Sequence, residues 1–455
     1  MIRRLSTLLL AAALTPACTP TLYPPTVEVP LAYHYDTDFR NDTLRIDSCW
    51  WRLFGDTTLN RLVERALEQN RDLWSAASKV EQAREQLRIA RAEFLPSVGV
   101  DLSAKADYNR ATKIVQNYAF GPALSWEISL FGALRQTKQA ARAEFSAAVW
   151  NYRGVALSLA AEVATTYFTL LQYERDLLVA THTYSLRRSS AALIDSLYTY
   201  GMSSGIDREQ AYSQLYSAEA DIPRYRTAIE QSRLALNLLL GEPPQAAVYG
   251  SGEALLTDQQ PYNLTVGVPS ELLRRRPDVM AAYHALQQAA ARAGVARAVR
   301  FPSLTLTASG GVGAASIQGL SSSNPAVWSA AGSIVAPLLN AGKLKAEERV
   351  AVEAYNEAAS TYEQTVLAAF SDVEQRLSAL AANRAETDRY RELVKAYTQI
   401  DEMAHALYRN GMVDYLDVID AERTLYAARM QLVNLVAQQY INYVSLCKAL
   451  GGGWR

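Results

Sequence analysis

The sequence predicts a mainly α-helical chain with a small β part, built from two tandem structural repeats. Each repeat is expected to contain a β-hairpin and very long coiled-coil helices. Three observations lead to this fold class: a residue pattern recurs after about 210 positions, two long stretches contain no proline, and alternating strand-like segments interrupt each half. Because a repeat of this size dictates architecture, the two halves are expected to fold alike.

The repeat is clearest in two stretches, YTYGMSSGIDREQAYSQLYSAEA and YRNGMVDYLDVIDAERTLYAARM. Six residues keep their spacing in both: Tyr198, Gly201, Met202, Asp207, Ala211 and Leu215 match Tyr408, Gly411, Met412, Asp417, Ala421 and Leu425. Glycine commonly ends a helix in the left-handed conformation. Gly201 and Gly411 are therefore predicted to end two long helices and reverse the chain, with return helices starting near Ile206 and Tyr415.

The first 17 residues have the features of an export signal. MIRR is a basic start, LSTLLLAAAL an apolar run too short to span a bilayer, and TPAC a cleavage region. The region around Cys18 resembles a bacterial lipobox, although Thr15 stands where that pattern prefers leucine. We expect lipidation of Cys18, with cleavage after Ala17 and no lipid as the alternative. Residues 18–44 would then form a loose, proline-rich, lipidated tether.

The tether is followed by repeat one over residues 45–242, a linker over 243–262 and repeat two over 263–455. Each repeat opens with Ala-, Leu-, Arg-, Gln- and Glu-rich sequence, a composition that favours helix. This helical sequence stops at a proline in each repeat, Pro96 or Pro302.

Strand-like segments follow each proline. Apolar and polar residues alternate from Val98 to Tyr108 and again from Tyr118 to Leu130, the period of a strand. Residues 303–314 and 327–339 repeat this pair more weakly, because glycines dilute the pattern. Four strands of about ten or more residues suit a tilted crossing of a bilayer.

The more common role of alternating strands is a soluble sheet with one wet face. Here, however, aromatic residues stand near the strand ends, as in the girdles of membrane barrels: Tyr108, Tyr118, Phe120, Trp126 and Trp328. Four strands cannot close a barrel, and lipid does not tolerate an open sheet edge. If these strands enter a membrane, several chains must share one barrel.

Two proline-free stretches, from about 133 to 198 and from about 342 to 408, predict helices of about 100 Å each. Apolar residues along the helices keep a spacing of 3 and 4, which indicates coiled coils. Pro223 is expected to kink or interrupt the first return helix. The predicted seams are Leu159, Val163, Thr166, Leu170, Tyr173 and Leu177, then Leu416, Ile419, Arg423, Tyr426, Met430, Val433, Ala437, Tyr440, Val444 and Cys447.

Composition argues against several functions. A net charge of −1 gives no basic face for a nucleic-acid partner. The four histidines are scattered, so no metal site is expected, and no glycine-rich phosphate loop predicts a nucleotide or other cofactor. No catalytic constellation is recognisable, so the chain is not expected to be an enzyme. We also expect no transmembrane helix, and free thiols at Cys49 and Cys447, with a bridge between these two as the alternative.

Several stretches resemble the TolC-like outer-membrane efflux proteins, and specifically the lipoprotein branch found in tripartite RND-type efflux systems. They include VPSELLRRRPDVMAAYHALQQAAARAGVARAVRFPSLTLTASGG, SWEISLFGALR, LNAGKLKA, ADIPRYRTAIEQSRLALNLLLGEPP and GMVDYLDVIDAERTLYAARMQLVNLVAQQYINYVSLCKALGGGW. The resemblance covers nearly all of residues 45–454. In this branch a proline at the position of Pro223 is normal.

The resemblance implies a homotrimer with a periplasmic α-barrel and a shared 12-stranded transmembrane β-barrel in the outer membrane. Segments around Phe54 and residues 248–268 would form an equatorial belt. The expected partners are outer-membrane lipid, a periplasmic adaptor and an inner-membrane pump, for which this chain would be a passive exit duct. The alternatives are a duct for protein or peptide secretion and a structural coiled-coil lipoprotein.

The resemblance also implies a gate at the periplasmic tip of the coiled coils, where inner helices pinch the tunnel shut. Asp417 and Asp420 are the candidates for its acidic lining, and Val413 for its apolar part. Asp207 and Tyr408 would be tip residues that hold neighbouring coils closed. In a trimer each aspartate position becomes a ring of three carboxylates, which favours cations. The alternative is that these aspartates cap a helix start, a role that suits Asp414.

Overall fold

The computed structural model describes residues 22–27, 29–30, 33, 49–109, 113–245, 269–321 and 326–452. The predicted signal segment, Cys18 and most of the predicted linker lie outside these residues. Contacts divide the chain into two compact units. We call residues 77–151 and 278–365, with the described residues of 22–27, the sheet unit. Residues 28–76, 152–277 and 366–455 are the tip unit.

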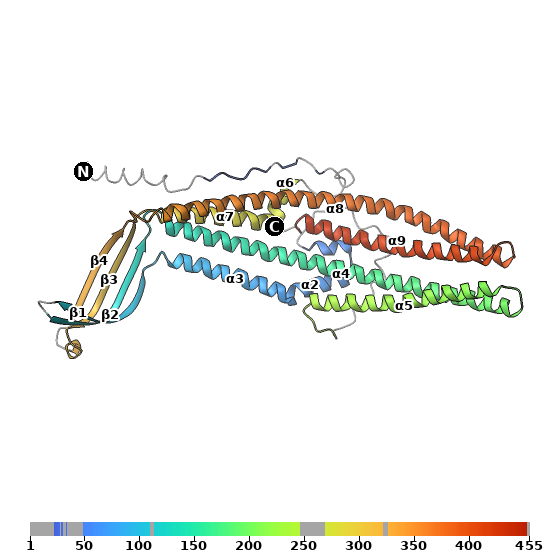
Figure 1. Cartoon of the computed structure of the whole chain (residues 1–455), viewed down its shortest axis with the longest axis horizontal. Coiled ribbons are helices and arrows are strands. Elements are labelled where there is room, and N and C mark those ends of the chain that lie inside the picture. Colours follow the sequence, from blue (N-terminus) through green and yellow to red (C-terminus); the bar gives the residue numbers. More distant parts are fainter. Residues whose placement is uncertain are drawn as a thin grey trace. The chain divides into compact units, whose positions relative to one another are not determined.

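The sheet unit contains one antiparallel sheet of four strands (Figure 1). These are β1 (Ser97–Asn109), β2 (Lys113–Ile128), β3 (Ser303–Ala314) and β4 (Ala326–Val335), in the order β1-β2-β3-β4. A short 3-10 helix, η4 (Gln318–Ser321), follows β3. The four predicted strands are confirmed, and the pairing of β2 with β3, for example Tyr118 with Ala314, joins the two hairpins.

Glycine explains why the alternation is weak in the second hairpin. A Cβ atom on Gly121 of β2 would lie 2.0 Å from the carbonyl oxygen of Gly310 on β3. The two strands therefore approach closely only because neither position carries a side chain.

The described residues of the chain cover neither face of this sheet. Along β1 both alternating sets are exposed, and every residue of β4 is exposed. Leu102 is 78% exposed and Trp328 85% exposed. The sheet therefore does not pack one face on a core of the same chain. The apolar side chains of the sheet need an apolar environment that comes from outside the chain.

The helices confirm the repeat. The 67-residue helices α4 (Ala133–Thr199) and α8 (Lys343–Arg409) correspond, as do the 35-residue helices α5 (Gly205–Leu239) and α9 (Tyr415–Ala449). The 22-residue helices α3 (Arg71–Ala92) and α7 (Pro277–Ala298) also correspond. In Figure 1, α4 and α5 form one hairpin and α8 and α9 another.

The helical sequence that opens each repeat is divided in two. In the first repeat, α2 (Thr57–Gln69) ends at Asn70, whose extended backbone starts α3. The Asn70 side chain accepts hydrogen bonds from the backbone N–H groups of Asp72 and Leu73, at 2.9 and 3.0 Å, as an N-cap does. In the second repeat, α6 (Pro269–Arg275) stops just before Pro277, the first residue of α7.

Both predicted glycine turns are confirmed. Gly201 and Gly411 have φ values of 72° and 70°, in the left-handed region that glycine adopts at little cost. The residue after each glycine donates its N–H to a carbonyl five residues earlier: Met202 to Leu197 and Met412 to Leu407, at 2.8 and 3.0 Å. This is the Schellman motif, and it ends α4 and α8 in the same way.

The structure refines three expectations about the helices. Of the two effects expected of Pro223, interruption does not occur, because α5 runs unbroken from Gly205 to Leu239, and a kink stays a prediction. In α9 the predicted seam is only partly buried near the tip: Ile419 is 7% exposed, whereas Leu416 is 60% exposed and Arg423 is exposed, and a neighbouring stripe is buried as well: Val418, Ala421, Leu425 and Ala428. From Ala437 onward the predicted seam is buried. The chain's own packing therefore leaves part of an apolar seam uncovered.

The third expectation was that the chain has no transmembrane helix. One 18-residue window of α4 is apolar enough by composition to cross a membrane. However, 61% of that window is buried inside the structure. Burial against neighbouring helices therefore accounts for its apolar composition.

Aromatic packing anchors the start of the tip unit. The 3-10 helix η3 (Trp50–Phe54) places Phe54 with its ring centroid 5.1 Å from Phe168 of α4 and 6.2 Å from Tyr440 of α9. The other predicted belt segment, residues 248–268, lies outside the described residues. Cys447 is a free, fully buried thiol, so it forms no bridge with Cys49. Burial raises the pKa of the Cys447 thiol to about 12.

Candidate functional site at the coiled-coil tip

An apolar cluster fixes the start of α9 against the first-repeat helices. Its buried members come from α4, α5 and α9: Ala191, Ile194, Ala211, Tyr415, Val418 and Ile419. Tyr408 of α8 packs on the same cluster, with its ring 5.4 Å from that of Tyr415. The cluster holds the first turn of α9, and with it the predicted gate aspartates, in a defined position relative to α4 and α5.

The two return helices start differently. In α5 the Ser204 hydroxyl accepts a hydrogen bond from the Asp207 N–H, and the Asp207 carboxylate accepts from the Ser204 N–H, each at 3.1 Å. This capping box lowers the pKa of Asp207, because hydrogen bonds from Ser204 and Ser203 outweigh partial burial. Asp207 therefore serves its own helix start.

The second repeat has no such box. Asp414 occupies the N-cap position of α9, but its side chain makes no capping hydrogen bond. The Asp417 N–H donates to the Asp414 carbonyl oxygen at 3.1 Å. The alternative that the aspartates cap the start of α9 is therefore wrong for Asp414, which it suited best, and Asp417 takes part in no capping box.

The remaining predicted gate residues differ in their surroundings. Asp420 is exposed and accepts a hydrogen bond from the Arg423 guanidinium at 2.7 Å. Asp417 is also exposed and, among the described residues, has no ion pair. Val413 is half-buried in the turn. The structure thus brings Asp417 and Asp420 onto one exposed side of α9, but only Asp420 carries its own counter-charge.

Tyr408 connects the two helical hairpins. Its side chain packs on the apolar cluster that Ala191, Ile194 and Ala211 of α4 and α5 form with the start of α9. Burial and the nearby Asp207 carboxylate raise the pKa of Tyr408. Within one chain, Tyr408 therefore ties the end of α8 to the first-repeat tip.

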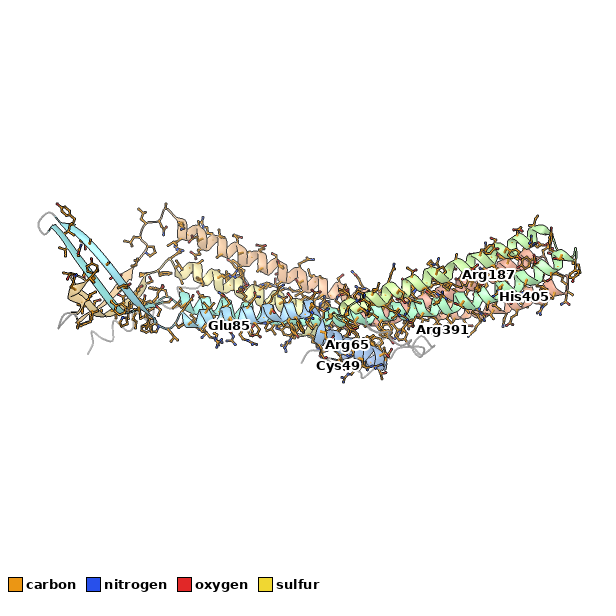
Figure 2. All side chains as sticks on the ribbon, turned by 90° about the horizontal axis from the view of Figure 1, so that it is seen from below. Cys49, Arg65, Glu85, Arg187, Arg391 and His405 are labelled. Carbon is orange, nitrogen blue, oxygen red and sulfur yellow. The ribbon has the colours of Figure 1, made fainter. Side chains whose placement is uncertain are left out.

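The sequence analysis missed a cavity of about 380 Å³ between α4, α8 and α9 in the tip unit. Glu422 of α9 lines it, 3.1 Å from His405 Nε2 of α8 and 3.8 Å from Arg187 Nε of α4. Figure 2 labels Arg187 and His405 on the helices that lead to the tip turns. One sequence signal could have pointed to this cluster. Arg187 stands at helical spacing from Ala180, Ala191 and Ile194, where an apolar residue would be expected.

A second polar group joins α9 to α5. The Tyr426 hydroxyl donates a hydrogen bond to Asp221 Oδ2 at 2.7 Å, and Asp221 also pairs with Arg224 at 3.1 Å. On α4, the Asp176 carboxyl is 5% exposed, and burial raises its pKa to about 7. The tip unit thus holds its helices together through polar contacts that the apolar pattern did not predict.

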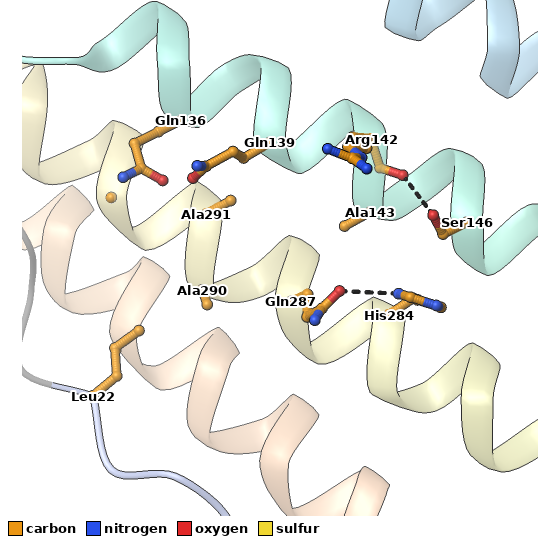
Figure 3. A pocket seen from close by; sticks show the side chains of 11 residues that line it. Leu22, Gln136, Gln139, Arg142, Ala143, Ser146, His284, Gln287, Ala290 and Ala291 are labelled. Carbon is orange, nitrogen blue, oxygen red and sulfur yellow. Dashed lines mark hydrogen bonds between the residues drawn. The ribbon is translucent and has the colours of Figure 1, made fainter. Parts of the chain in front are cut away.

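The sheet unit has a different cavity, of about 620 Å³, between α4 and α7 (Figure 3). Gln136, Gln139 and Arg142 line it from α4, and His284 and Gln287 from α7. His284 hydrogen-bonds to Gln287 at 2.9 Å. The lining residues include no carboxylate that would pair with this histidine as in a catalytic site.

Arg276, at the start of repeat two, has a packing role. Arg276 Nη1 donates to Asp372 Oδ2 of α8 at 3.0 Å and to the carbonyl oxygen of Ala449, in the last turn of α9, at 3.1 Å. Among the described residues, no group of three or more His, Cys, Asp or Glu side chains is arranged to hold a metal ion.

Comparison with known proteins gives a consistent set of relatives. The family model described as outer membrane efflux protein matches residues 62–242 and 268–452. The solvent efflux pump outer membrane protein SrpC of Pseudomonas putida is 35% identical over 88% of this chain and 86% of its own length. The probable outer membrane lipoprotein SilC of Salmonella typhimurium is 32% identical over 90% of this chain and 88% of its own length.

Among solved structures, the outer-membrane channel OprN superposes with a TM-score of 0.90. The match has 28% sequence identity and covers 96% of this chain and 99% of OprN.

Proposed function

Since this chain belongs to the outer membrane efflux protein family and is an outer-membrane channel of efflux pumps, we propose that it works as a passive, homotrimeric exit duct gated at its periplasmic tip. The observation that carries the proposal is the four-stranded sheet, whose apolar faces and two outer strands are left open by the described chain. Three copies supply twelve strands, enough for a closed barrel in the outer membrane.

One exposed residue of the α9 seam supports the same assembly. Leu416, near the tip, is 60% exposed and is not covered by the chain's own helices. A neighbouring copy would bury it and complete a periplasmic α-barrel. Native mass spectrometry of the detergent-extracted protein tests this directly. A mass three times that of the mature chain is expected, and a monomer would contradict the proposal.

We assign the gate to the first turns of α9. In a trimer, Asp417 forms a ring of three carboxylates, and Asp420 a second ring one helical turn further along. Because Arg423 offsets the charge of Asp420, Asp417 supplies most of the uncompensated negative charge. Val413, Asp207 and Tyr408 belong to the surrounding tip, where Tyr408 and the Asp207 helix start hold the hairpins in place.

The partners we propose are a periplasmic adaptor and an inner-membrane pump, which supplies the energy. Large apolar side chains are exposed at the tip turns: Tyr200, Met202, Ile206 and Met412 are 68–78% exposed. Such an apolar patch marks a contact surface for another protein. No catalysis is part of this proposal.

We propose small molecules as the cargo, as the name of the solvent efflux relative SrpC indicates for that protein. Deletion of the gene in a strain without related ducts should raise sensitivity to organic solvents or other toxic small molecules. Secretion of peptides without any change in sensitivity would favour the alternative of a secretion duct.

The proposed anchor is a lipid on Cys18, which lies outside the described residues. The first residues of the tether that are described, Leu22–Val27, run along the sheet unit: the Tyr355 hydroxyl of α8 donates to the Tyr23 carbonyl oxygen at 3.0 Å. Metabolic labelling with palmitate should label the wild type and not Cys18→Ala. An unlabelled wild type would mean cleavage without lipidation.

A further inference from the structure

We propose that Glu422 latches the start of α9 to α4, and that proton binding at His405 sets how tightly this latch holds the channel closed. The inference rests on the proposed tip gate and adds its regulation. It is carried by the three-helix cavity in the tip unit, none of whose charged residues has a role in the proposed gate itself.

Glu422 is a shared carboxylate. Its side chain is 11% exposed and lies within reach of both neighbouring helices. From α8 it contacts His405 Nε2 at 3.1 Å, and from α4 it contacts Ser190 Oγ at 3.5 Å and Arg187 Nε at 3.8 Å. The carboxylate therefore ties a helix of the second hairpin to a helix of the first.

Arg187 cannot follow Glu422 if α9 moves. Its side chain is 4% exposed, its Nη1 donates to the Gln214 carbonyl oxygen of α5 at 3.0 Å, and its guanidinium lies 5.5 Å from the centre of the Tyr426 ring. Among the described residues, Arg187 Nε has no hydrogen-bond partner, so Glu422 is its counter-ion. Withdrawing Glu422 would leave a buried guanidinium uncompensated, which strongly disfavours the movement.

The latch lies close to the gate. Glu422 follows Asp417 by five residues on the same helix, a rise of about 7.5 Å. A rigid helix transmits a restraint over this distance. Whatever holds Glu422 against α4 therefore also holds the Asp417 ring in its closed position.

His405 gives the latch a proton dependence. With His405 protonated, the Glu422 carboxylate has a cation on each side. With His405 neutral, only Arg187 remains, and the desolvated carboxylate is held less well. The hydrogen bond to Glu422 is the main reason that the pKa of His405 is raised, against opposing desolvation. The other charged or titratable groups around His405 are Asp401, Tyr408 and Arg409 on α8, Tyr426 and Arg429 on α9, and Arg187 on α4.

The sign follows from this raised pKa. Closing the latch favours the protonated histidine, so the stabilisation is fully present below the ordinary histidine pKa of about 6.5. It is lost as pH rises through the higher pKa of the latched state. The channel is therefore closed most tightly in mildly acidic medium and opens more readily as pH rises.

The first repeat offers a contrast. The residue that corresponds to His405 is Asp195, which pairs with Arg208 at 2.7 Å on a largely exposed surface. This pair contains no histidine. The proton-sensitive contact is thus specific to the hairpin that carries the predicted gate aspartates.

The test is single-channel recording of the full-length protein in planar bilayers, from about pH 5.5 to about pH 8.5 around the histidine pKa. Wild type should open more often at high pH, by about tenfold for each unit by which latching raises the His405 pKa. His405→Gln should lose this dependence. His182→Gln, which changes an exposed histidine on α4, should keep it.

A second readout does not depend on conduction. Hydrogen–deuterium exchange at the histidine C2 position, read by peptide mass spectrometry, gives the pKa of His405 itself. Glu422→Gln should bring that pKa back toward about 6.5 and should open the channel frequently at every pH. If Glu422→Gln does not fold, the variant with glutamine at both Arg187 and Glu422 removes the buried charge pair together.

The outcomes separate the two proposals. An unchanged pH dependence in His405→Gln, or rare opening in a folded variant that lacks the Glu422 carboxylate, overturns the latch. If these variants fail in this way while Asp417→Ser still alters ion selectivity, the gate stands and only the latch is lost. Absence of any conduction from folded trimers would remove the proposed duct and the latch with it.

Discussion

Asp207 and Asp417 occupy the same position in the two repeats, yet only the Asp207 carboxylate caps its helix. The difference arises one turn earlier, where Ser204 completes a capping box and Asp414 makes no capping hydrogen bond. The repeat therefore uses one aspartate for local stability and leaves the other available to face a channel.

This asymmetry predicts unequal effects of the two gate substitutions. Asp417→Ser should reduce cation selectivity more than Asp420→Ser, because Arg423 already offsets the charge of Asp420. Reversal potentials in a salt gradient measure this selectivity. Glu209→Ser, at an exposed acid near the other tip turn, is the matched control and should change little. Equal shifts for Asp417→Ser and Asp420→Ser would contradict the assignment.

The positive φ of Gly411 predicts that a residue with a side chain at this position destabilises the tip. Gly411→Ala should destabilise the tip by about 1–2 kcal/mol, because alanine disfavours the left-handed backbone while its Cβ would meet no atom within 4 Å. Gly205→Ala is the control, since that glycine begins α5 without a positive φ and its Cβ would only touch Tyr198 at 3.7 Å. Amide hydrogen exchange across the tip should show faster opening in Gly411→Ala alone.

The raised pKa of Asp176 predicts that the free energy of unfolding depends on pH. Its raised pKa means that the folded chain retains a proton that the unfolded chain releases above about pH 4. Stability should therefore fall as pH rises from about 4 to about 7, and remain lower above that range.

Asp176→Asn, which cannot ionise, should stabilise the protein at pH 8 by about 2–4 kcal/mol and have little effect below pH 4. Thermal unfolding in detergent at both pH values measures this difference. A variant that is less stable at pH 8 would show that the Asp176 carboxylate is well solvated or paired in the folded protein.

The contact between Tyr426 and Asp221 predicts a coupling between the hairpins. Tyr426→Phe removes a 2.7 Å hydrogen bond that joins α9 to α5, and should cost about 1–2 kcal/mol. Tyr216→Phe, at a 60% exposed position that keeps its stacked ring, should cost much less. Denaturation in detergent compares the free energies of unfolding of the two variants. Equal losses of stability would mean that the hydrogen bond between Tyr426 and Asp221 contributes no specific stability.

Much of the fold could be predicted because its signals are local. Gly201 and Gly411 end helices through a backbone geometry that glycine favours, and the alternation from Val98 to Tyr108 is the direct period of a strand. Pro223 does not interrupt α5, which was one of its two expected effects, because the cost of an internal proline is local, whereas the packing that keeps α5 continuous is tertiary.

The site was only partly predictable for a related reason. Asp417 and Asp420 were candidates because of their position in the stretch that resembles the efflux family, and their role in a gate stays a prediction. Glu422, His405 and Arg187 are separated by up to 235 residues along the chain, and only the packing of three helices brings them together. The exposed Leu416 shows the same limit, since a heptad pattern does not say which chain supplies the partner helix.

The central claim is that three copies of this chain form a duct whose tip is gated by Asp417 and Asp420. Single-channel conductance of the purified protein in a planar bilayer, with the Asp417→Ser/Asp420→Ser double variant beside it, tests this claim most directly. We expect small, cation-selective openings in the wild type, and larger or less selective openings in the variant. Folded trimers whose conductance and selectivity are identical in both forms would contradict it.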